Sequence, residues 1–421
     1  MYILGISCFY HDSAVSLIKD GKIVAAAEEE RFSRIKHDSG FPKNAVDFCL
    51  KQAGISVKDL SYVGFYEKPF LKFERILYTS LATFPFSFPF FLKAIPVWIK
   101  EKLWMPQLIK KELKYHGEVL FVDHHLSHAA SSFLVSPFEK AAILTLDAVG
   151  EWTTSAYGFG EGPKLVLEKE INFPHSLGMF YSAFTAHLGF EVMEGEYKVM
   201  GLAAFGKPKY VDQVKRVIKI SPDGSFQLDL NYFAYHFGEK MVNRKFEKLF
   251  GPPRQKDGPV TEYHEDLAAS LQTVTEEIIL KMCHFLYKKY KTDNLCLAGG
   301  VALNCVANGK ILRQTPFKNI FIQPAAGDAG GALGAAFYIW NTLLGQPRDF
   351  VMDHAYWGPG YSDEEIENFL KKNSIKYRRL EEEELIKTTA RLIAQNKVVG
   401  WFHGRMEFGP RALGHRSILA N

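Results

Sequence analysis

The sequence predicts an α/β protein in which one structural unit occurs twice. A strand followed by a β-hairpin opens the chain, and the same order of strand and hairpin returns near its middle. The length points the same way, because 421 residues are too many for one compact core and favour a large duplicated domain with a further fragment, or two domains. Apolar residues at 47% and charged residues at 23% are ordinary for a globular protein, which excludes a disordered or fibrous chain.

The first unit is a hairpin meander followed by a helix and a strand. The dipeptide Asp20-Gly21 is typical of the tight turn that joins two antiparallel strands. We expect strands at 2–8, 14–18, 23–27 and 62–66, and a helix at 42–53.

Residues 68–115 interrupt this α/β order with a helical, aromatic and basic insertion. Within it, residues 76–92 are uncharged and apolar, but Pro85 and Pro89 would break a membrane-spanning helix. We therefore expect a lid or a packed insertion here rather than an interfacial membrane anchor.

The second unit repeats the order of the first and completes a domain over residues 1–346. It begins with a strand and a helix, continues with a strand and a glycine-interrupted hairpin, and ends with a small-residue helix that starts at Asp328. We expect strands at 119–122, 141–146, 294–297 and 319–322, a hairpin at 153–166, and helices at 125–136, 264–290 and 301–313.

The pattern changes after Gln346. A linker is predicted at 347–374, although its residues 363–372 have helical spacing, and a further domain is predicted to begin at 375. This domain starts with a helix at 382–395, a buried strand at 398–402 and a Gly/Arg-rich loop at 403–416. The final apolar run has no predicted strand to pair with, so we expect residues 375–421 to be the beginning of a truncated domain.

Charge and cysteine usage indicate the compartment and exclude one class of partner. The formal charge of +4 is small and forms no basic stripe, so no nucleic-acid partner is expected. The first residues lack the basic region of a secretory signal, which predicts a cytoplasmic protein. The cysteines form no C-x-x-C pair and are predicted to be buried free thiols. They are Cys8, Cys49, Cys283, Cys296 and Cys305.

Two histidines and two aspartates are candidates for a metal site. His124 and His128 are four residues apart, so on a helix they lie on one face a single turn apart. The alternative is a helix start capped by Asp123 with one buried imidazole. Asp147 and Asp328 each follow a strand, where a carboxylate is costly to bury unless it meets a cation or several donors. Such a ligand set suits a divalent transition metal, iron or manganese before zinc.

Three glycine-containing loops follow strands and predict a phosphate-binding cleft. They contain Gly150, the pair Gly299-Gly300 with Asn304 shortly after it, and Gly327. Free N–H groups at the start of a helix attract phosphate, which would place a nucleotide here. Each loop taken alone could equally be a turn or a tight helix contact.

Two further groups carry candidate chemistry. His11 and Asp12 lie in the first hairpin loop, where the imidazole could take a proton from a hydroxyl, or where both residues could form an ordinary polar turn. Arg405, Arg411 and Arg416 alternate with glycines, a spacing that suits an anion such as a phosphate, with a solvated basic loop as the alternative.

Seven segments in order resemble the signature motifs of the nodulation-factor, cephamycin and tobramycin O-carbamoyltransferases. The match covers nearly the whole chain, and seven ordered motifs are far more specific than any one of them. The segments are HDSAVSL (11–17), DHHLSHAASSF (123–133), LDAVGEWTT (146–154), GEYKVMGLAAFG (195–206), GGVALN (299–304), GDAGGALGAA (327–336) and GRMEFGPRALGHRSILA (404–420).

This resemblance implies a duplicated actin-like (ribonuclease H-like) ATPase fold followed by the start of an α/β YrdC-like domain. It implies that carbamoyl phosphate and ATP give carbamoyl-adenylate, whose carbamoyl group passes to a hydroxyl of a sugar, glycan or antibiotic-like acceptor. The implied cofactors are Fe(II) or a similar divalent ion and ATP, with Mg²⁺ as its companion. The implied metal ligands are His124, His128, Asp147 and Asp328, and Lys198 would lie close to the transfer site.

Two other readings stay open. An actin-like sugar kinase or ATPase would use the same hairpins and glycine loops without needing the H-x-x-x-H pair. A non-catalytic nucleotide-binding partner would depend on a separate activating subunit. The acceptor is not readable from the sequence, and the oligomeric state is open between a monomer and a homodimer.

Overall fold

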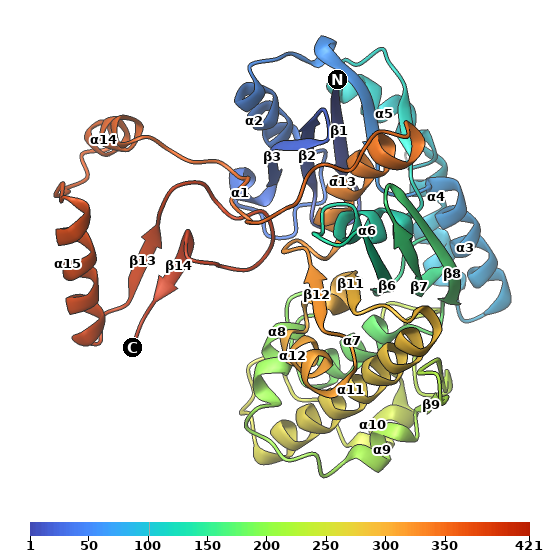
Figure 1. Ribbon diagram of the computed structural model, residues 1–421. Helices are drawn as coiled ribbons and strands as arrows, with labels where there is room; N and C mark the ends of the chain where they lie inside the picture. Colours follow the sequence, from blue (N-terminus) through green and yellow to red (C-terminus); the bar gives the residue numbers. More distant parts are fainter. Residues whose placement is uncertain (101) are drawn as a thin grey trace.

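The computed structural model describes residues 1–100 and 102–421, and its body contains two five-stranded sheets of the same topology (Figure 1). The first sheet has the order β3-β2-β1-β4-β5 and the second the order β12-β11-β6-β7-β8. In each sheet the second strand along the chain is antiparallel to both of its neighbours, and the remaining pairs are parallel. Numbered within each half, both sheets read 3-2-1-4-5, the ribonuclease H-like order. The predicted duplicated actin-like fold is confirmed.

The strands have bounds close to those expected. The first sheet consists of β1 (Tyr2–Ser7), β2 (Ala14–Lys19), β3 (Lys22–Glu28), β4 (Leu60–Phe65) and β5 (Val119–Phe121). The expectation that the strand at 119–122 opens the second unit was wrong, because β5 pairs in parallel with β4 of the first sheet. The second consists of β6 (Lys140–Leu146), β7 (Thr153–Glu161), β8 (Lys164–Asn172), β11 (Asn294–Ala298) and β12 (Asn319–Ile322).

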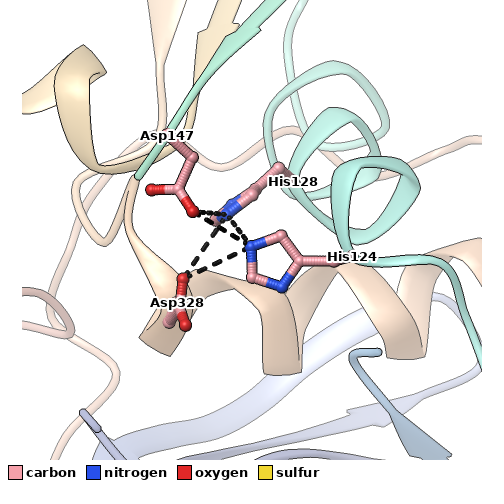
Figure 2. A group of neighbouring side chains, drawn as sticks. All are labelled: His124, His128, Asp147 and Asp328. Carbon is pink, nitrogen blue, oxygen red and sulfur yellow. Dashed lines mark hydrogen bonds and ion pairs between the residues drawn. The ribbon is translucent and has the colours of Figure 1, made fainter. Parts of the chain in front are cut away.

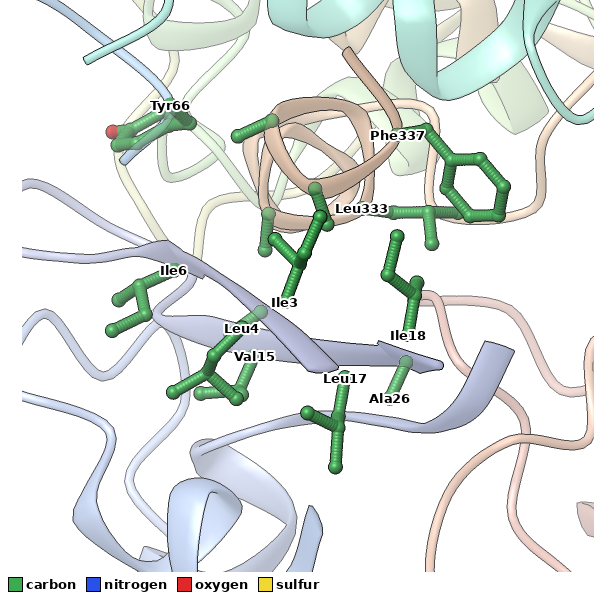
Figure 3. Close-up of a cluster of buried hydrophobic side chains, with 14 of the residues drawn as sticks. Ile3, Leu4, Ile6, Val15, Leu17, Ile18, Ala26, Tyr66, Leu333 and Phe337 are labelled. Atoms are coloured by element: carbon green, nitrogen blue, oxygen red, sulfur yellow. The ribbon is translucent and has the colours of Figure 1, made fainter. Parts of the chain in front are cut away.

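The first strands are apolar along their length because both of their faces are covered. Ile3 and Ile18 are register partners and point toward Leu333 and Phe337 of helix α13 (Figure 3). Leu4, the next residue on β1, points to the opposite face of the sheet, and all five side chains are buried. A strand buried on both faces reads as a continuous apolar run rather than an alternating one.

Two central helices join the halves, and their first residues carry the candidate metal ligands. Helix α6 (His124–Phe133) follows β5, and α13 (Asp328–Phe337) packs against α6, β1 and β2. A Cβ added to Gly334 would overlap the carbonyl oxygen of Ser127, so the small residues of α13 allow the two helix backbones to approach directly. This close packing brings both helix N-termini to the same place.

The remaining elements surround this frame. The structure has two apolar cores, one that includes the central helices and the first sheet, and one on the other face of the second sheet. Near the first sheet lie α1 (Glu30–Ser33) and α2 (Lys43–Ala53). Around the second sheet lie α7 (Leu177–His187), α8 (Glu196–Leu202), α9 (Val211–Lys215), α10 (Arg244–Phe250), α11 (Glu262–Tyr290), α12 (Cys305–Gln314) and the hairpin of β9 (Ile218–Ile220) and β10 (Phe226–Leu228).

The insertion at 68–115 is helical, as expected, but much of it is not packed. It contains α3 (Pro69–Ala82), α4 (Phe88–Lys100) and α5 (Met105–Leu113), and residue 101 lies outside the described residues. Phe84 and Phe86, between α3 and α4, are 66% and 74% exposed, so of the expected lid or packed insertion the packed form is wrong for this segment. Among the helices of the described residues, none is long and apolar enough to cross a bilayer.

Within the predicted linker lies α14 (Asp363–Lys372), and after it come α15 (Glu382–Ala394) and the hairpin of β13 (Val399–Phe402) and β14 (Arg416–Leu419). All of these elements lie to one side of the body (Figure 1). Two expectations were wrong here. The strand at 398–402 is not buried, since Val398 is 71% exposed, and the last apolar run does pair, with β13. Both differences arise because an isolated hairpin uses apolar side chains without covering them.

Candidate functional site

Four buried side chains converge on one point where the central helices begin (Figure 2). The Nε2 atoms of His124 and His128 are 3.0 Å apart, and Oδ2 of Asp147 lies 3.1 and 3.7 Å from them. Oδ1 of Asp328 lies 3.6 Å from His124 Nε2 and 3.5 Å from His128 Nε2. The four residues named from sequence are therefore brought together.

The fold explains how distant residues meet. His124 and His128 lie one turn apart on α6, as their spacing predicts. Asp147 follows the last residue of β6, and Asp328 is the first residue of α13. The close packing of α6 on α13 then sets the distance between the imidazoles and the Asp328 carboxylate.

The arrangement fits one divalent metal ion. Ligand atoms bound at about 2.1 Å are about 3.0 Å apart at right angles and about 3.4 Å apart at tetrahedral angles, close to the distances above. Two Nε2 atoms facing each other at 3.0 Å need either a shared proton or a cation between them. Imidazole with carboxylate is a set typical of iron, manganese and zinc rather than calcium.

Acidic residues behind the ligands were missed by the sequence reading. Glu67 is fully buried, pairs with Lys72 at 2.6 Å and lies 3.7 Å from Nδ1 of His124, where a carboxylate orients a metal-binding imidazole. The Tyr66 hydroxyl donates to Asp328 Oδ2 at 3.3 Å. An acidic residue directly after a buried strand was the signal that singled out Asp147, and Glu67 carries the same signal after β4.

The start of α6 is held by a residue other than the expected one. Asp123 precedes the helix but makes no side-chain cap, and instead pairs with Lys68 Nζ at 2.9 Å. The Glu151 carboxylate accepts from the backbone N–H of His124 at 3.0 Å and from that of Lys68 at 2.8 Å. A long-range contact thus replaces the local cap, because Glu151 comes from the turn after β6.

The neighbouring His125 is a structural residue and not a ligand. Its two ring nitrogens lie 2.7 Å from the Thr145 hydroxyl and 2.9 Å from the Thr153 carbonyl oxygen. Burial, together with the charges of His124 and His128, lowers the pKa of His125 to about 3. It therefore remains neutral while the H-x-x-x-H pair beside it changes charge.

Protons would compete with a metal ion for the cluster. Burial lowers the pKa of His124, but Asp328 and Asp147 outweigh this and raise it well above its usual value. Burial raises the pKa of Asp147, yet hydrogen bonds from His124 and His128 hold it well below the usual range. Without metal, the His124 contribution to stability is complete below pH about 6.5 and is lost as pH rises through its raised pKa. The Asp147 contribution is complete above pH about 4 and is lost as pH falls.

We therefore expect metal affinity to rise with pH, by about tenfold per pH unit where one proton is displaced. The measurement is the increase in melting temperature on adding Mn²⁺ or Zn²⁺ to metal-free protein at pH 6 and at pH 8. The increase should be larger at pH 8. An equal increase at the two pH values would contradict proton displacement from the cluster.

Two of the glycine loops meet beside Asp147. The N–H of Gly300 donates to Asp147 Oδ1 at 2.9 Å, and the N–H of Gly299 donates to the Ala326 carbonyl at 2.8 Å. A Cβ at Gly327 would have the Gly300 Cα as its nearest neighbour, at 4.0 Å. The predicted convergence of these turns is therefore present next to the metal cluster.

The expected helix at 301–313 begins later than predicted. A 3₁₀ turn at Gly300–Leu303 separates the glycine pair from α12, and Asn304 is the N-cap. The Asn304 side chain accepts from the Ala307 N–H at 3.0 Å and donates to Gln272 at 2.9 Å. Cys305, the first residue of α12, is exposed, whereas the other four cysteines are buried as expected.

His11 and Asp12 lie at the edge of the metal cluster. Nδ1 of His11 is 3.0 Å from Asp12 Oδ2, and its Nε2 is 3.4 Å from Asp328 Oδ2. Burial lowers the pKa of His11, but Asp328 and Asp12 outweigh it and raise the pKa to about 9. A cation at Asp328 would offset part of that negative charge. The other oxygen of Asp12 contacts His37 Nδ1 at 2.6 Å.

Lys198 is placed outside this cluster. It is an exposed residue of α8, and its charge acts on Glu194, which pairs with Lys36.

The three arginines of the C-terminal loop have different surroundings. Arg405 donates to the carbonyls of Trp357 and Gly358, and Arg416 donates to those of Glu407 and Gly409. These contacts hold the loop in shape. Arg411 donates to the Leu303 carbonyl next to Asn304, and its guanidinium lies 5.5 Å from the ring centre of Tyr197. Of the three, Arg411 is therefore next to the glycine turns.

Comparison with known proteins agrees with the motif order. The family model described as carbamoyltransferase N-terminus matches residues 2–337, and that described as carbamoyltransferase C-terminus matches residues 390–421. An uncharacterized protein of Synechocystis is 50% identical over 436 residues, which cover 100% of this chain and 71% of that protein. Nodulation protein NolNO of Sinorhizobium fredii is 36% identical over 98% of this chain and 58% of its own length.

A more distant relative and a solved structure complete the comparison. The 3'-hydroxymethylcephem-O-carbamoyltransferase of Amycolatopsis lactamdurans is 24% identical over 97% of this chain and 72% of its own length. Component A of the Acidaminococcus fermentans (R)-2-hydroxyglutaryl-CoA dehydratase aligns with a TM-score of 0.41 and 14% identity, over 82% of this chain and 99% of that one. The fold assignment depends on the strand order alone.

The family resemblance seen in the seven motifs is confirmed. The N-terminal model spans most of the chain, and the Synechocystis relative shares half of the aligned residues along all of it. The chain therefore belongs to the carbamoyltransferase family of enzymes.

Proposed function

We propose that this chain transfers a carbamoyl group from carbamoyl-adenylate to a hydroxyl of a sugar, glycan or antibiotic-like acceptor. Carbamoyl phosphate and ATP are the proposed sources of the adenylate, as the family resemblance implies. The observation that carries the proposal is the juxtaposition of a buried two-histidine, two-aspartate cluster with the glycine turns at Gly300 and Gly327. A sugar kinase needs the glycine turns but has no use for a buried pair of imidazoles.

The proposed metal ligands are His124, His128, Asp147 and Asp328, and Fe(II) is the proposed ion. When bound, the ion supplies positive charge beside the place where negative charge develops during transfer. Glu67 and Glu151 position the ligands through His124, the first at its ring and the second at its backbone.

The transfer needs a bond exchange and one proton acceptor. The acceptor oxygen forms a bond to the carbamoyl carbon, the bond from that carbon to the adenylate phosphate breaks, and AMP leaves with its electron pair. The proton of the hydroxyl goes to neutral His11, which is the proposed base, and an ion held by Asp328 would favour this neutral form by offsetting the negative charge that raises the pKa of His11. Asp12 at Nδ1 holds the ring so that Nε2 faces the cluster, and this is the nitrogen that accepts.

The proposed nucleotide contacts lie near Oδ1 of Asp147, whereas the imidazole of His124 lies near Oδ2. The contacts are proposed at the facing turns of Gly299, Gly300 and Gly327, at Asn304, which begins α12, and at Arg411, which reaches the same place from the C-terminal loop. The N–H groups of Gly299 and Gly300 already bond Ala326 and Asp147, so the Arg411 guanidinium is the proposed partner for a phosphate. Gly150 contributes indirectly, by giving room to the His124 ring.

The products of the reaction test this function. The chain is incubated with carbamoyl-adenylate and, separately, with carbamoyl phosphate and ATP, each with a hydroxymethylcephem or a hexosamine as the probe acceptor. Formation of AMP and an O-carbamoyl product supports the proposal. ADP with a phosphorylated sugar would identify a kinase. No product from supplied carbamoyl-adenylate would favour a non-catalytic nucleotide-binding partner.

Substitution His11→Ala is expected to lower transfer from supplied carbamoyl-adenylate at least 100-fold, because a positioned base contributes about 10²–10⁴ in rate. Metal content should be unchanged, since His11 is not one of the four ligands. The matched control is His116→Ala, which removes an exposed imidazole after α5 and should leave the rate unchanged. A His11→Ala enzyme with the parental transfer rate would remove His11 from the mechanism.

A further inference from the structure

The helical insertion presents an apolar surface that nothing in the described residues covers. We define the α3–α4 apolar surface by Leu81, Phe84, Phe86, Phe88, Leu92 and Ile99, all of which are exposed. Helices α3 and α4 lie along the outer edge of the body, on the side away from α14 and α15 (Figure 1). An exposed cluster of this kind marks an interaction site more often than a random surface.

The charges around this surface are mostly basic, although Lys93 of α4 pairs with Glu239 at 2.6 Å. Residues 68–115 contain nine basic and three acidic residues, and no acidic residue occurs from 75 to 100. Nine basic minus three acidic residues give the insertion a formal charge of +6, which exceeds the +4 of the whole chain. Apolar aromatic side chains combined with flanking lysines are typical of elements that lie in the headgroup region of an anionic bilayer.

A hollow beside the α3–α4 turn extends the same chemistry. It has a volume of about 680 Å³ and is lined by Phe84, Phe86 and Phe237 together with Arg244 and Lys245. The rings of Phe86 and Phe237 are 6.0 Å apart between centres. Phenyl groups on one side and two exposed cations on the other match a lipid, with its acyl chain next to an anionic headgroup.

We propose that this protein binds the surface of an anionic lipid bilayer through the α3–α4 apolar surface. Helix α4 has 13 residues, or about 20 Å at 1.5 Å per residue, so it is too short for a hydrocarbon core of about 30 Å and lies along the interface. Lys100 and Lys245 contact the headgroups. The inference is independent of the proposed carbamoyl transfer, because it depends on no residue of the metal cluster.

Co-sedimentation of the full 421-residue chain with lipid vesicles tests the proposal. Vesicles of phosphatidylcholine with one quarter phosphatidylglycerol are compared with phosphatidylcholine alone. We expect binding to the anionic vesicles that weakens with added salt. The variant Phe86→Ser/Phe88→Ser should bind at least tenfold less, and Lys100→Glu/Lys245→Glu should lose the preference for phosphatidylglycerol.

A matched control distinguishes binding through this surface from nonspecific hydrophobic binding. Phe205 is 78% exposed on another part of the chain, and Phe205→Ser should bind like the parent. An equal loss in Phe205→Ser, or no binding to anionic vesicles, overturns the proposal. So does light scattering in which Phe86→Ser/Phe88→Ser turns an oligomer into a monomer without lipid, because a second copy of the chain then covers the surface.

A measurement on the parent fold guards against unfolding of the double variant. Trp104 follows α4 and is 57% exposed. Acyl chains brominated near the headgroup should quench its fluorescence, and Trp104→Phe should remove most of that quenching. Quenching that persists unchanged in Trp104→Phe would place the contact elsewhere and overturn the assignment.

Discussion

Replacing Asp147 with Asn is expected to release the metal ion and to lower carbamoyl transfer at least 100-fold. Oδ2 of Asp147 is 3.1 Å from His124 Nε2 and 3.7 Å from His128 Nε2, so the carboxylate closes the ligand set beside both imidazoles. An amide keeps the acceptor for the Gly300 N–H but loses the negative charge. Removing one partner of a buried charge pair costs about 3–5 kcal/mol, so the metal-free variant should also be less stable than the metal-free parent.

The measurements are metal content by mass spectrometry after dialysis, the transfer rate, and the urea midpoint of the metal-free proteins. Asp123→Asn is the matched control, since Asp123 is half-exposed and pairs only with Lys68. Its effect on stability should stay within about 0.5 kcal/mol. An Asp147→Asn protein that retains one ion per chain would show that the Asp147 carboxylate is not needed to hold the ion.

The substitution Gly150→Ala should damage the site without touching a ligand atom. A Cβ at position 150 would lie 2.8 Å from Cδ2 and 2.9 Å from Cγ of His124, closer than real contacts allow. Either the turn or the imidazole must move, and such overpacking costs about 1–3 kcal/mol. Because His124 Nε2 is a proposed ligand atom, we expect metal affinity to fall at least tenfold and the transfer rate to fall with it.

Gly201→Ala provides the comparison. A Cβ at Gly201 would meet no atom within 4 Å, and the residue lies inside α8. Alanine is favoured over glycine inside a helix by about 1 kcal/mol, so this variant should be slightly more stable than the parent and should bind metal normally. Normal metal affinity in Gly150→Ala would mean that the His124 ring tolerates displacement.

The fold was predictable where neighbouring segments determine the pairing. The turn at Asp20-Gly21 makes β2 and β3 adjacent, and the continuous apolar runs indicate strands covered on both faces. The parallel pairing of β1 with β4 was not readable from local pattern, because it depends on a crossover longer than thirty residues. The actin-like fold was identified from the seven motifs and not from the periodicity of apolar residues.

The candidate site was predictable to the extent that each residue carries its own signal. All four clustered groups carried such a signal, His124 and His128 through their spacing and the two aspartates, Asp147 and Asp328, through their positions after strands. Glu151 was not predictable as the group that holds α6, because the contact joins residues 27 positions apart. The packing of Arg405 and Arg416 against backbone carbonyls likewise depends on a loop conformation that glycine spacing does not specify.

The insertion at 68–115 shows a different limit. The sequence predicted a lid or a packed segment, because apolar side chains are more often buried than exposed. The structure leaves Phe84 and Phe86 largely facing solvent, although the ring of Phe86 lies 6.0 Å from that of Phe237. Pattern alone cannot distinguish a side chain meant for the interior from one meant for another partner.

The cluster takes its ligands from both copies of the repeated unit. His124 and His128 come from the helix that follows the last strand of the first sheet, whereas Asp147 and Asp328 belong to the second. A coordinated ion would therefore cross-link the two lobes and limit rotation of one against the other. His11 belongs to the half that contains the first sheet, and the glycine turns belong to the half that contains the second. A bound ion would therefore fix the distance between His11 and these turns, which is the space available to the acceptor and the nucleotide.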